Sequence, residues 1–88
     1  MDPGKQYLIV STFGWGLVGK FVKMTNFNDA DFEEAHFVTK CGDETDWGRF
    51  VRNGPGRNPV VNLLGKITVN LDHRIFSAEF PYVMPKSR

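Results

Sequence analysis

The chain has 88 residues, which suits one domain with a single core, and its 41% hydrophobic and 24% charged residues are typical of a folded protein. Its 11 basic and 10 acidic residues leave a net charge of +1, so nothing in the composition requires a nucleic-acid or membrane partner. Cys41 is the only cysteine, which excludes an internal disulfide. No apolar run approaches the roughly 20 residues of a membrane-spanning helix. We therefore expect a cytoplasmic protein.

Two strands joined by a glycine bend are predicted at the start of the chain. Residues 6–13 are rich in β-branched and aromatic side chains and show no helical stripe, which favours a strand. The following Gly14-Trp15-Gly16 suits a tight hairpin bend, because glycine reaches positive φ without a steric penalty. Residues 17–24 predict the second strand, in which Gly19 indicates a bulge or a close backbone approach.

The middle of the chain predicts a polar loop, a third strand and one short helix. Residues 25–31 are rich in turn formers and predict a loop, and a strand follows near residues 32–41. Residues 46–53 place apolar side chains at the i, i+3 and i+4 spacing of one helical face. Gly54, followed by a proline, is expected to end this helix.

A final β pair completes the predicted fold. Residues 67–71 and 76–80 both alternate apolar with polar side chains, and Asp72-His73 lies between them at the turn. The fold class is therefore mainly β: a small, five-stranded, curled, barrel-like antiparallel sheet with one short helix.

The predicted organisation is a single domain with short ends. We expect a flexible N-terminus over residues 1–5, one barrel-like β domain over residues 6–82, and a C-terminal tail over residues 83–88.

Aromatic side chains are unusually frequent for so small a domain. They make up 14% of the residues, including eight Phe, which is more than a small core readily absorbs. Surplus apolar surface often lies in a contact between subunits, so we expect a homo-oligomer. The rings expected in the core or in a subunit contact are Trp15, Trp47, Phe50 and Phe76.

A set of short motifs connects the chain to a known family. The motifs are Phe32-Glu33-Glu34-Ala35-His36-Phe37-Val38, Cys41-Gly42, Gly48-Arg49-Phe50, Gly54-Pro55 and Gly65-Lys66-Ile67-Thr68-Val69. With residues 7–20, they resemble a family of small uncharacterised proteins found in phages, bacterial genomes and integron gene cassettes. The chain departs from that pattern at Cys41, where the family more usually has Trp. The resemblance implies the β architecture and an origin in a mobile genetic element, and it implies no activity.

No nucleophile–base pair and no zinc pattern is predicted. His36 and Cys41 are separated by an odd number of residues on one predicted strand, so their side chains are expected to point to opposite faces. One cysteine and two widely spaced histidines, His36 and His73, match no zinc spacing. We therefore expect neither a catalytic residue nor a metal ligand, and no cofactor.

The acidic and glycine-rich segments are also interpreted structurally. The cluster Asn28-Asp29-Ala30-Asp31 with Glu33 and Glu34 lacks the layout of a calcium-binding EF-hand loop, so a solvated loop is expected. Glu33 and Glu34 are neighbours on a strand and are expected to face opposite ways, which is unsuited to a catalytic carboxylate pair. Gly54-Pro55-Gly56-Arg57 lacks the Lys-Ser/Thr ending of a phosphate-binding loop and predicts a turn.

Three functions remain open at this point. The leading hypothesis is a non-enzymatic, homo-oligomeric interaction protein of a mobile genetic element. The second is a single-stranded nucleic-acid-binding module, in which Trp15 would stack on a base and Arg49, Arg52 and Arg57 would contact phosphates, although the balanced charge argues against it. The third is a small-ligand binder in a cleft between subunits. An enzymatic function ranks below these three.

Overall fold

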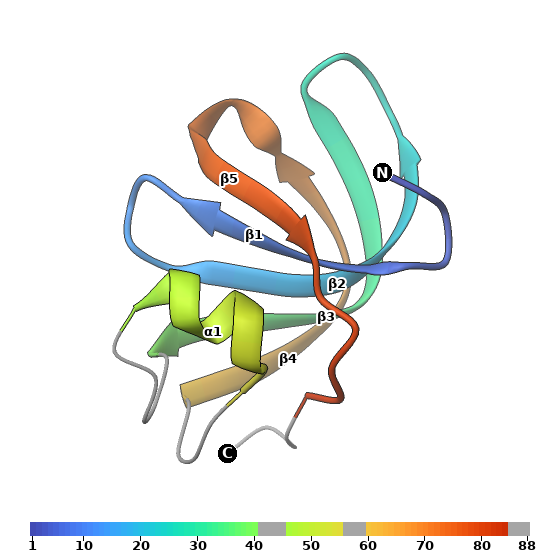
Figure 1. The fold of residues 1–88 in the computed structure, drawn as a ribbon. Coiled ribbons are helices and arrows are strands. Elements are labelled where there is room, and N and C mark those ends of the chain that lie inside the picture. Colours follow the sequence, from blue (N-terminus) through green and yellow to red (C-terminus); the bar gives the residue numbers. More distant parts are fainter. Residues whose placement is uncertain (41–45, 56–59, 85–88) are drawn as a thin grey trace.

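The computed structural model describes residues 1–40, 46–55 and 60–84, which form one five-stranded antiparallel sheet and one short helix (Figure 1). The strands are β1 (Gln6–Ser11), β2 (Gly16–Met24), β3 (Asp29–Lys40), β4 (Val60–Asn70) and β5 (Arg74–Glu79). Helix α1 (Trp47–Asn53) follows β3, and the 3-10 turn η1 (Leu71–His73) joins β4 to β5. Among these residues, no helix is long and apolar enough to cross a bilayer.

The strands follow one another as a meander whose last strand returns to the first. Their order in the sheet is β4-β3-β2-β1-β5, so β4 and β5 are its two edges. Ile9 of β1 and Val69 of β4 share one core cluster although two strands lie between them, because the sheet curves strongly (Figure 1). The prediction of a mainly β fold with one short helix is confirmed. The sheet is not closed, so the expected barrel is met only in part.

Both faces of the sheet carry a hydrophobic core. Along β1, Tyr7 and Ile9 face one cluster, whereas Leu8 and Val10 face the other, because side chains alternate along a strand. The first core cluster comprises Tyr7, Ile9, Leu17, Phe21, Ala30, Phe32, Ala35, Val69 and Leu71. The helix-side cluster comprises Leu8, Val10, Val18, Val38, Phe50, Val61 and Phe80. Helix α1 and the segment after β5 contribute to the second cluster only, so they cover one face of the sheet.

The glycine predictions in the first hairpin are confirmed. Gly14 has a φ of 90° and lies in the bend between β1 and β2, although β1 ends at Ser11, two residues earlier than predicted. A Cβ on Gly19 would lie 3.2 Å from the Cβ of Phe32, and the β2–β3 register shifts next to this glycine. A close backbone approach and a bulge therefore coincide there.

The polar loop after β2 is shorter than the sequence predicts. The side-chain oxygen of Asn26 accepts hydrogen bonds from the backbone N–H groups of Asn28 and Asp29, each at 2.9 Å, which closes the turn early. Strand β3 therefore begins at Asp29, and Ala30 is fully buried. The expectation of a solvated loop through Asp31 is wrong over its last three residues.

A bulge in β3 changes the predicted alternation of side chains. Glu34 has a φ of 49°, and the β3–β4 register shifts between Phe32 and Ala35. Glu33 and Glu34 are both exposed, and Phe32 and Ala35 both belong to the first core cluster. The extra residue thus lets two acidic side chains remain in solvent between two buried positions.

The bulged Glu34 forms an exposed ion pair with Lys20 of β2, whose Nζ lies 2.8 Å from a carboxylate oxygen. The hydrogen bond from Lys20, followed by its positive charge, lowers the pKa of Glu34 below 4.5, and the same contact raises the pKa of Lys20 above 10.5. A lowered carboxyl pKa stabilises the fold above the unfolded pKa, and this stabilisation is lost as the pH falls through the folded value. A raised amine pKa stabilises the fold at pH values below the pKa of the unfolded state. This stabilisation is lost as the pH rises through the pKa of the folded state.

We expect an NMR titration of the Glu34 carboxyl carbon to show its midpoint below 4.5, and Lys20→Gln to return it toward that value. Lys23→Gln is the matched control, since Lys23 lies on the same strand and is paired in register with Asp31. An unchanged Glu34 midpoint in Lys20→Gln would show that the ion pair does not persist in solution.

Candidate ligand groove

A groove of about 390 Å³ opens on the face of the sheet that carries the first core cluster. Its walls come from all five strands, from the bend between β1 and β2, and from η1. Because the curved sheet is not closed, β4 faces the end of β1 across this groove. The aromatic groove, as we call it, is therefore the open side of the sheet.

Two pairs of rings line the aromatic groove. Trp15 stacks on Phe37 of β3 with ring centroids 5.2 Å apart and planes inclined by 28°. Phe13 meets the imidazole of His73 at 5.3 Å with an inclination of 51°. Phe13 is 70% exposed, and Leu64 of β4, which also lines the groove, is 46% exposed. The groove thus presents apolar rings to solvent next to a buried core.

Backbone hydrogen bonds hold the rim of the groove in place. The N–H of Ser11 donates to the carbonyl of Trp15 at 2.9 Å, and that of Gly14 donates to the carbonyl of Ser11 at 3.0 Å. The hydroxyl oxygen of Ser11 accepts from the N–H of Phe13 at 3.0 Å. The N–H of Thr12 donates to the carbonyl of His73 at 2.8 Å, which ties the bend to η1. Both ring pairs are therefore carried by a hydrogen-bonded frame.

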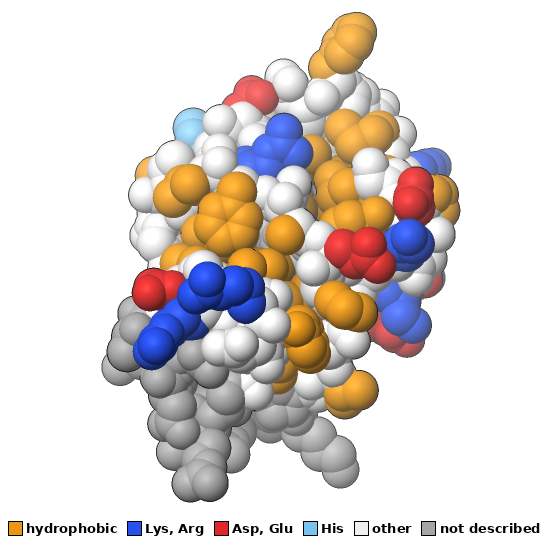
Figure 2. All heavy atoms as spheres, in the orientation of Figure 1, with side chains coloured by type: hydrophobic (Ala, Val, Ile, Leu, Met, Phe, Trp, Pro, Cys, Tyr) orange, Lys and Arg blue, Asp and Glu red, His pale blue; other side chains and the backbone are white. Residues whose placement is uncertain are grey.

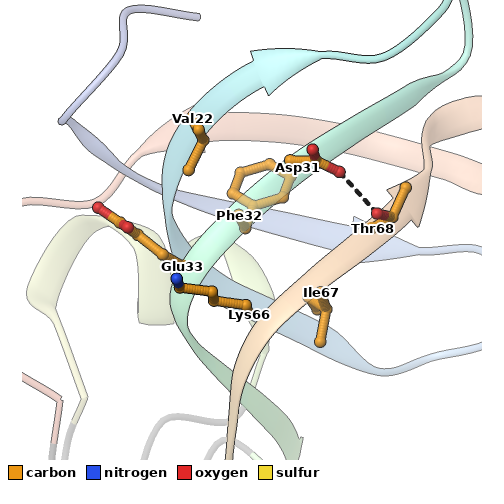
Figure 3. A pocket seen from close by; sticks show the side chains of 7 residues that line it. All are labelled: Val22, Asp31, Phe32, Glu33, Lys66, Ile67 and Thr68. Carbon is orange, nitrogen blue, oxygen red and sulfur yellow. Dashed lines mark hydrogen bonds between the residues drawn. The ribbon is translucent and has the colours of Figure 1, made fainter.

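A second pocket, of about 340 Å³, lies over β2, β3 and β4 (Figure 3). Asp31 accepts a hydrogen bond from the hydroxyl of Thr68 at 2.6 Å, whereas the carboxylate of Glu33 points away from Asp31 (Figure 3). Within the described ranges, no group of three or more His, Cys, Asp or Glu side chains converges as metal ligands do. The two carboxylates of this pocket do not form a shared site.

The structure separates the residues of the predicted nucleic-acid site. Trp15 packs against the first core cluster, whereas α1 packs through Phe50 on the helix-side cluster, on the other face of the sheet. Arg49 and Arg52 are exposed on α1, over which Figure 2 shows a group of basic side chains. Arg57 lies outside the described residues. The structure does not bring Trp15 and the arginines of α1 to one surface.

The other aromatic side chains singled out in the sequence lie on the helix side. Phe50 is fully buried, and Trp47 and Phe76 are half-buried against the helix-side cluster. The ring of Trp47 lies against Gly16, where an added Cβ would be 2.6 Å from it. The two tryptophans therefore lie on opposite faces of the sheet at the start of β2.

The two histidines lie on different elements, His36 on β3 and His73 on η1. His36 is half-buried on β3, and its Nδ1 is buried with no hydrogen-bond partner among the described residues. His73 is exposed on the rim of the aromatic groove. Cys41 lies outside the described residues, so its expected orientation relative to His36 stays a prediction.

Several residues of the groove were missed by the sequence reasoning. Phe13, Phe37, Leu64 and Arg74 come from four different parts of the chain, and each by itself reads as an ordinary strand or loop residue. The local signal for the groove was the pair Phe13 and Trp15, which flank Gly14. Rings in a bend are far from the centre of a core, so their side chains are often left at the surface. In comparisons with known proteins, the chain matches no family model and no curated protein.

Proposed function

We propose that this protein is a non-enzymatic ligand-binding domain, an open barrel-like sheet that holds a flat apolar group in the aromatic groove. The observation that carries the proposal is the stacked pair of Trp15 and Phe37 in a groove of about 390 Å³ with largely apolar walls. Small-molecule sites are typically concave, of about 300–1,000 Å³, and lined by hydrophobic and aromatic side chains with a few polar groups.

The energetics of the groove favour a flat apolar ligand. Phe13 and Leu64 both expose apolar surface at the groove, and covering such surface contributes roughly 25 cal/mol per Å². A flat ring that packs against aromatic side chains gains about 0.5–1.5 kcal/mol beyond that burial. Because the rim is already hydrogen-bonded, little ordering of the chain opposes this gain.

The two other hypotheses from the sequence have less support. Single-stranded nucleic acid is disfavoured because the arginines of α1 and Trp15 lie on different faces, and because the net charge is only +1. The homo-oligomer and the mobile-element origin stay predictions. Exposed apolar side chains on the edge strand β4, such as Val60, support self-association as a second candidate.

The proposal is tested with N-phenyl-naphthylamine, a neutral flat probe whose fluorescence rises in an apolar site. We expect saturable binding by the native protein and a loss of about threefold to tenfold in affinity for Leu64→Gln, which replaces part of the apolar wall by an amide. The matched control is Leu63→Gln. Leu63 is the neighbouring residue on β4, is 59% exposed and does not line the groove.

Equal affinities for Leu64→Gln and Leu63→Gln would place the probe elsewhere and refute the groove as the binding site. Absence of saturable binding by the native protein would refute the proposed function itself. Circular dichroism spectra of both variants establish that the comparison is between folded proteins.

A further inference from the structure

Several polar side chains of the aromatic groove that can donate hydrogen bonds lie at one end of it. Ser11 and Arg74 are paired in the β1–β5 register, and Asn70 is the last residue of β4, directly before η1. All three line the groove together with His73 of η1. The return of β5 to β1 therefore brings side chains from three strands to one corner of an otherwise apolar site.

Two side-chain oxygens in this corner each already accept a hydrogen bond from the backbone. The hydroxyl oxygen of Ser11 accepts from the N–H of Phe13, and the side-chain oxygen of Asn70 accepts from the N–H of Asp72 at 2.8 Å. Ser11 is only 2% exposed, so its hydroxyl is a fixed part of the groove rather than a solvated surface group. The hydroxyl hydrogen of Ser11 and the amide hydrogens of Asn70 remain as donors toward a ligand.

The charge in the groove is positive. Arg74 forms no ion pair with any acidic side chain in the described part of the chain, and its one side-chain hydrogen bond is a long contact of 3.5 Å to Ser77. The described residues that line the groove include neither Asp nor Glu. Asp72 is the nearest acid in sequence, but it is exposed on η1 and does not line the groove. The site therefore pairs a flat apolar wall with an uncompensated guanidinium.

We propose that the ligand of the aromatic groove is a flat aromatic anion, an inference that rests on the proposed function. Its ring system lies against Trp15 and Phe37, and its negative group pairs with Arg74 and accepts hydrogen bonds from Ser11 and Asn70. A guanidinium suits carboxylate, sulfonate and phosphate groups alike, because its donors form a planar fork that matches two anionic oxygens. A neutral ring packs against the same apolar wall but leaves Ser11, Asn70 and Arg74 hydrogen-bonded to water.

The test compares two probes that share one ring skeleton. N-phenyl-naphthylamine is neutral, and anilinonaphthalene sulfonate carries the same rings with one sulfonate. We expect Arg74→Gln to weaken sulfonate binding about tenfold while it changes binding of the neutral probe less than about twofold. Arg74→Lys, which keeps the charge without the fork, is expected to lose less than Arg74→Gln. Higher salt weakens the sulfonate selectively, because it screens the exposed charge.

Arg49→Gln is the matched control. It removes the same positive charge from α1, on the other face of the sheet, and is expected to change neither affinity. Displacement of the bound sulfonate by naphthoate and by naphthyl phosphate then distinguishes a carboxylate ligand from a phosphate ligand.

The outcomes separate this inference from the proposed function. If Arg74→Gln lowers the affinity for both probes equally, or lowers neither, the inference of an anionic ligand is refuted. Leu64→Gln still tests the groove in that case. If Leu64→Gln affects neither probe, the groove and the inference fail together. If a labelled oligothymidine displaces the sulfonate and loses affinity in Arg49→Gln, the site belongs to a nucleic-acid surface and the small anion is refuted.

Discussion

Replacing Phe50 with alanine is expected to lower the free energy of unfolding by about 3–5 kcal/mol. Phe50 is the buried residue of α1, and none of its surface is exposed. Its ring stacks on Phe80 with centroids 5.2 Å apart and planes inclined by 8°, and it meets Trp47 edge-on at 5.4 Å. The truncation removes the side chain through which α1 and the segment after β5 hold each other against the sheet.

Phe27→Ala is the matched control, because it removes the same atoms from a ring that is 99% exposed in the turn before β3. We expect it to change the stability by less than about 0.5 kcal/mol. Urea unfolding followed by far-ultraviolet circular dichroism measures both variants, and similar slopes indicate a change in stability alone. A loss below about 1 kcal/mol in Phe50→Ala would contradict the packing of α1 on the helix-side cluster.

Local signals in the sequence were enough to predict the helix and the first hairpin. The helix was predicted over residues 46–53, and α1 spans Trp47–Asn53 with Asp46 as its cap, whose carboxylate accepts from the N–H of Arg49 at 2.8 Å. The bend at Gly14 was predicted from glycine alone. In both cases the determining interactions lie within a few residues of each other, so they can be read without knowledge of the fold.

The start of β4 could not be predicted in this way. The sequence pattern indicated a strand from residue 67, whereas β4 begins at Val60. Leu63 and Leu64 are adjacent on an edge strand and both are partly exposed, so they show no alternation of buried and exposed residues. Gly65, with a φ of 78°, lies next to a register shift in the β3–β4 pairing. This segment is a strand because it pairs with β3. Such pairing between distant segments does not require an alternation of apolar and polar residues in the local sequence.

The same reason explains why the groove was not predicted, although one of its rings was singled out. Trp15 was predicted as a stacking residue, but its stacking partner Phe37 comes from β3, and the polar corner of the groove depends on the register that places Ser11 opposite Arg74. Arg49 and Arg52, which were predicted to join Trp15, lie on the other face because α1 covers the helix-side cluster. The sequence offered Trp15 with Arg49, Arg52 and Arg57 as a site, whereas the order of the strands places Arg74 with Trp15 in the lining of the groove.

Replacing Gly54 with alanine is the second substitution expected to have a large effect, a destabilisation of about 2–4 kcal/mol. Gly54 ends α1 with φ 80° and ψ −177°, a region that only glycine adopts readily. An added Cβ would lie 2.7 Å from the ring of Tyr82, whose hydroxyl donates to the carbonyl of Arg52 at 2.5 Å. The ring cannot move away without giving up this hydrogen bond and its edge-on contact with Phe80.

Gly14→Ala isolates the backbone part of this effect. Gly14 also has a positive φ, of 90°, but an added Cβ there meets nothing within 4 Å, so we expect a loss of only about 1 kcal/mol. The Gly54→Ala/Tyr82→Ala double variant isolates the steric part, since truncating the ring relieves the overlap. We expect its loss of stability to be smaller than the sum of the losses of the two single variants. Urea unfolding of these three variants and of Tyr82→Ala alone measures these terms. If Gly54→Ala costs no more than Gly14→Ala, the ring of Tyr82 does not pack on the end of α1.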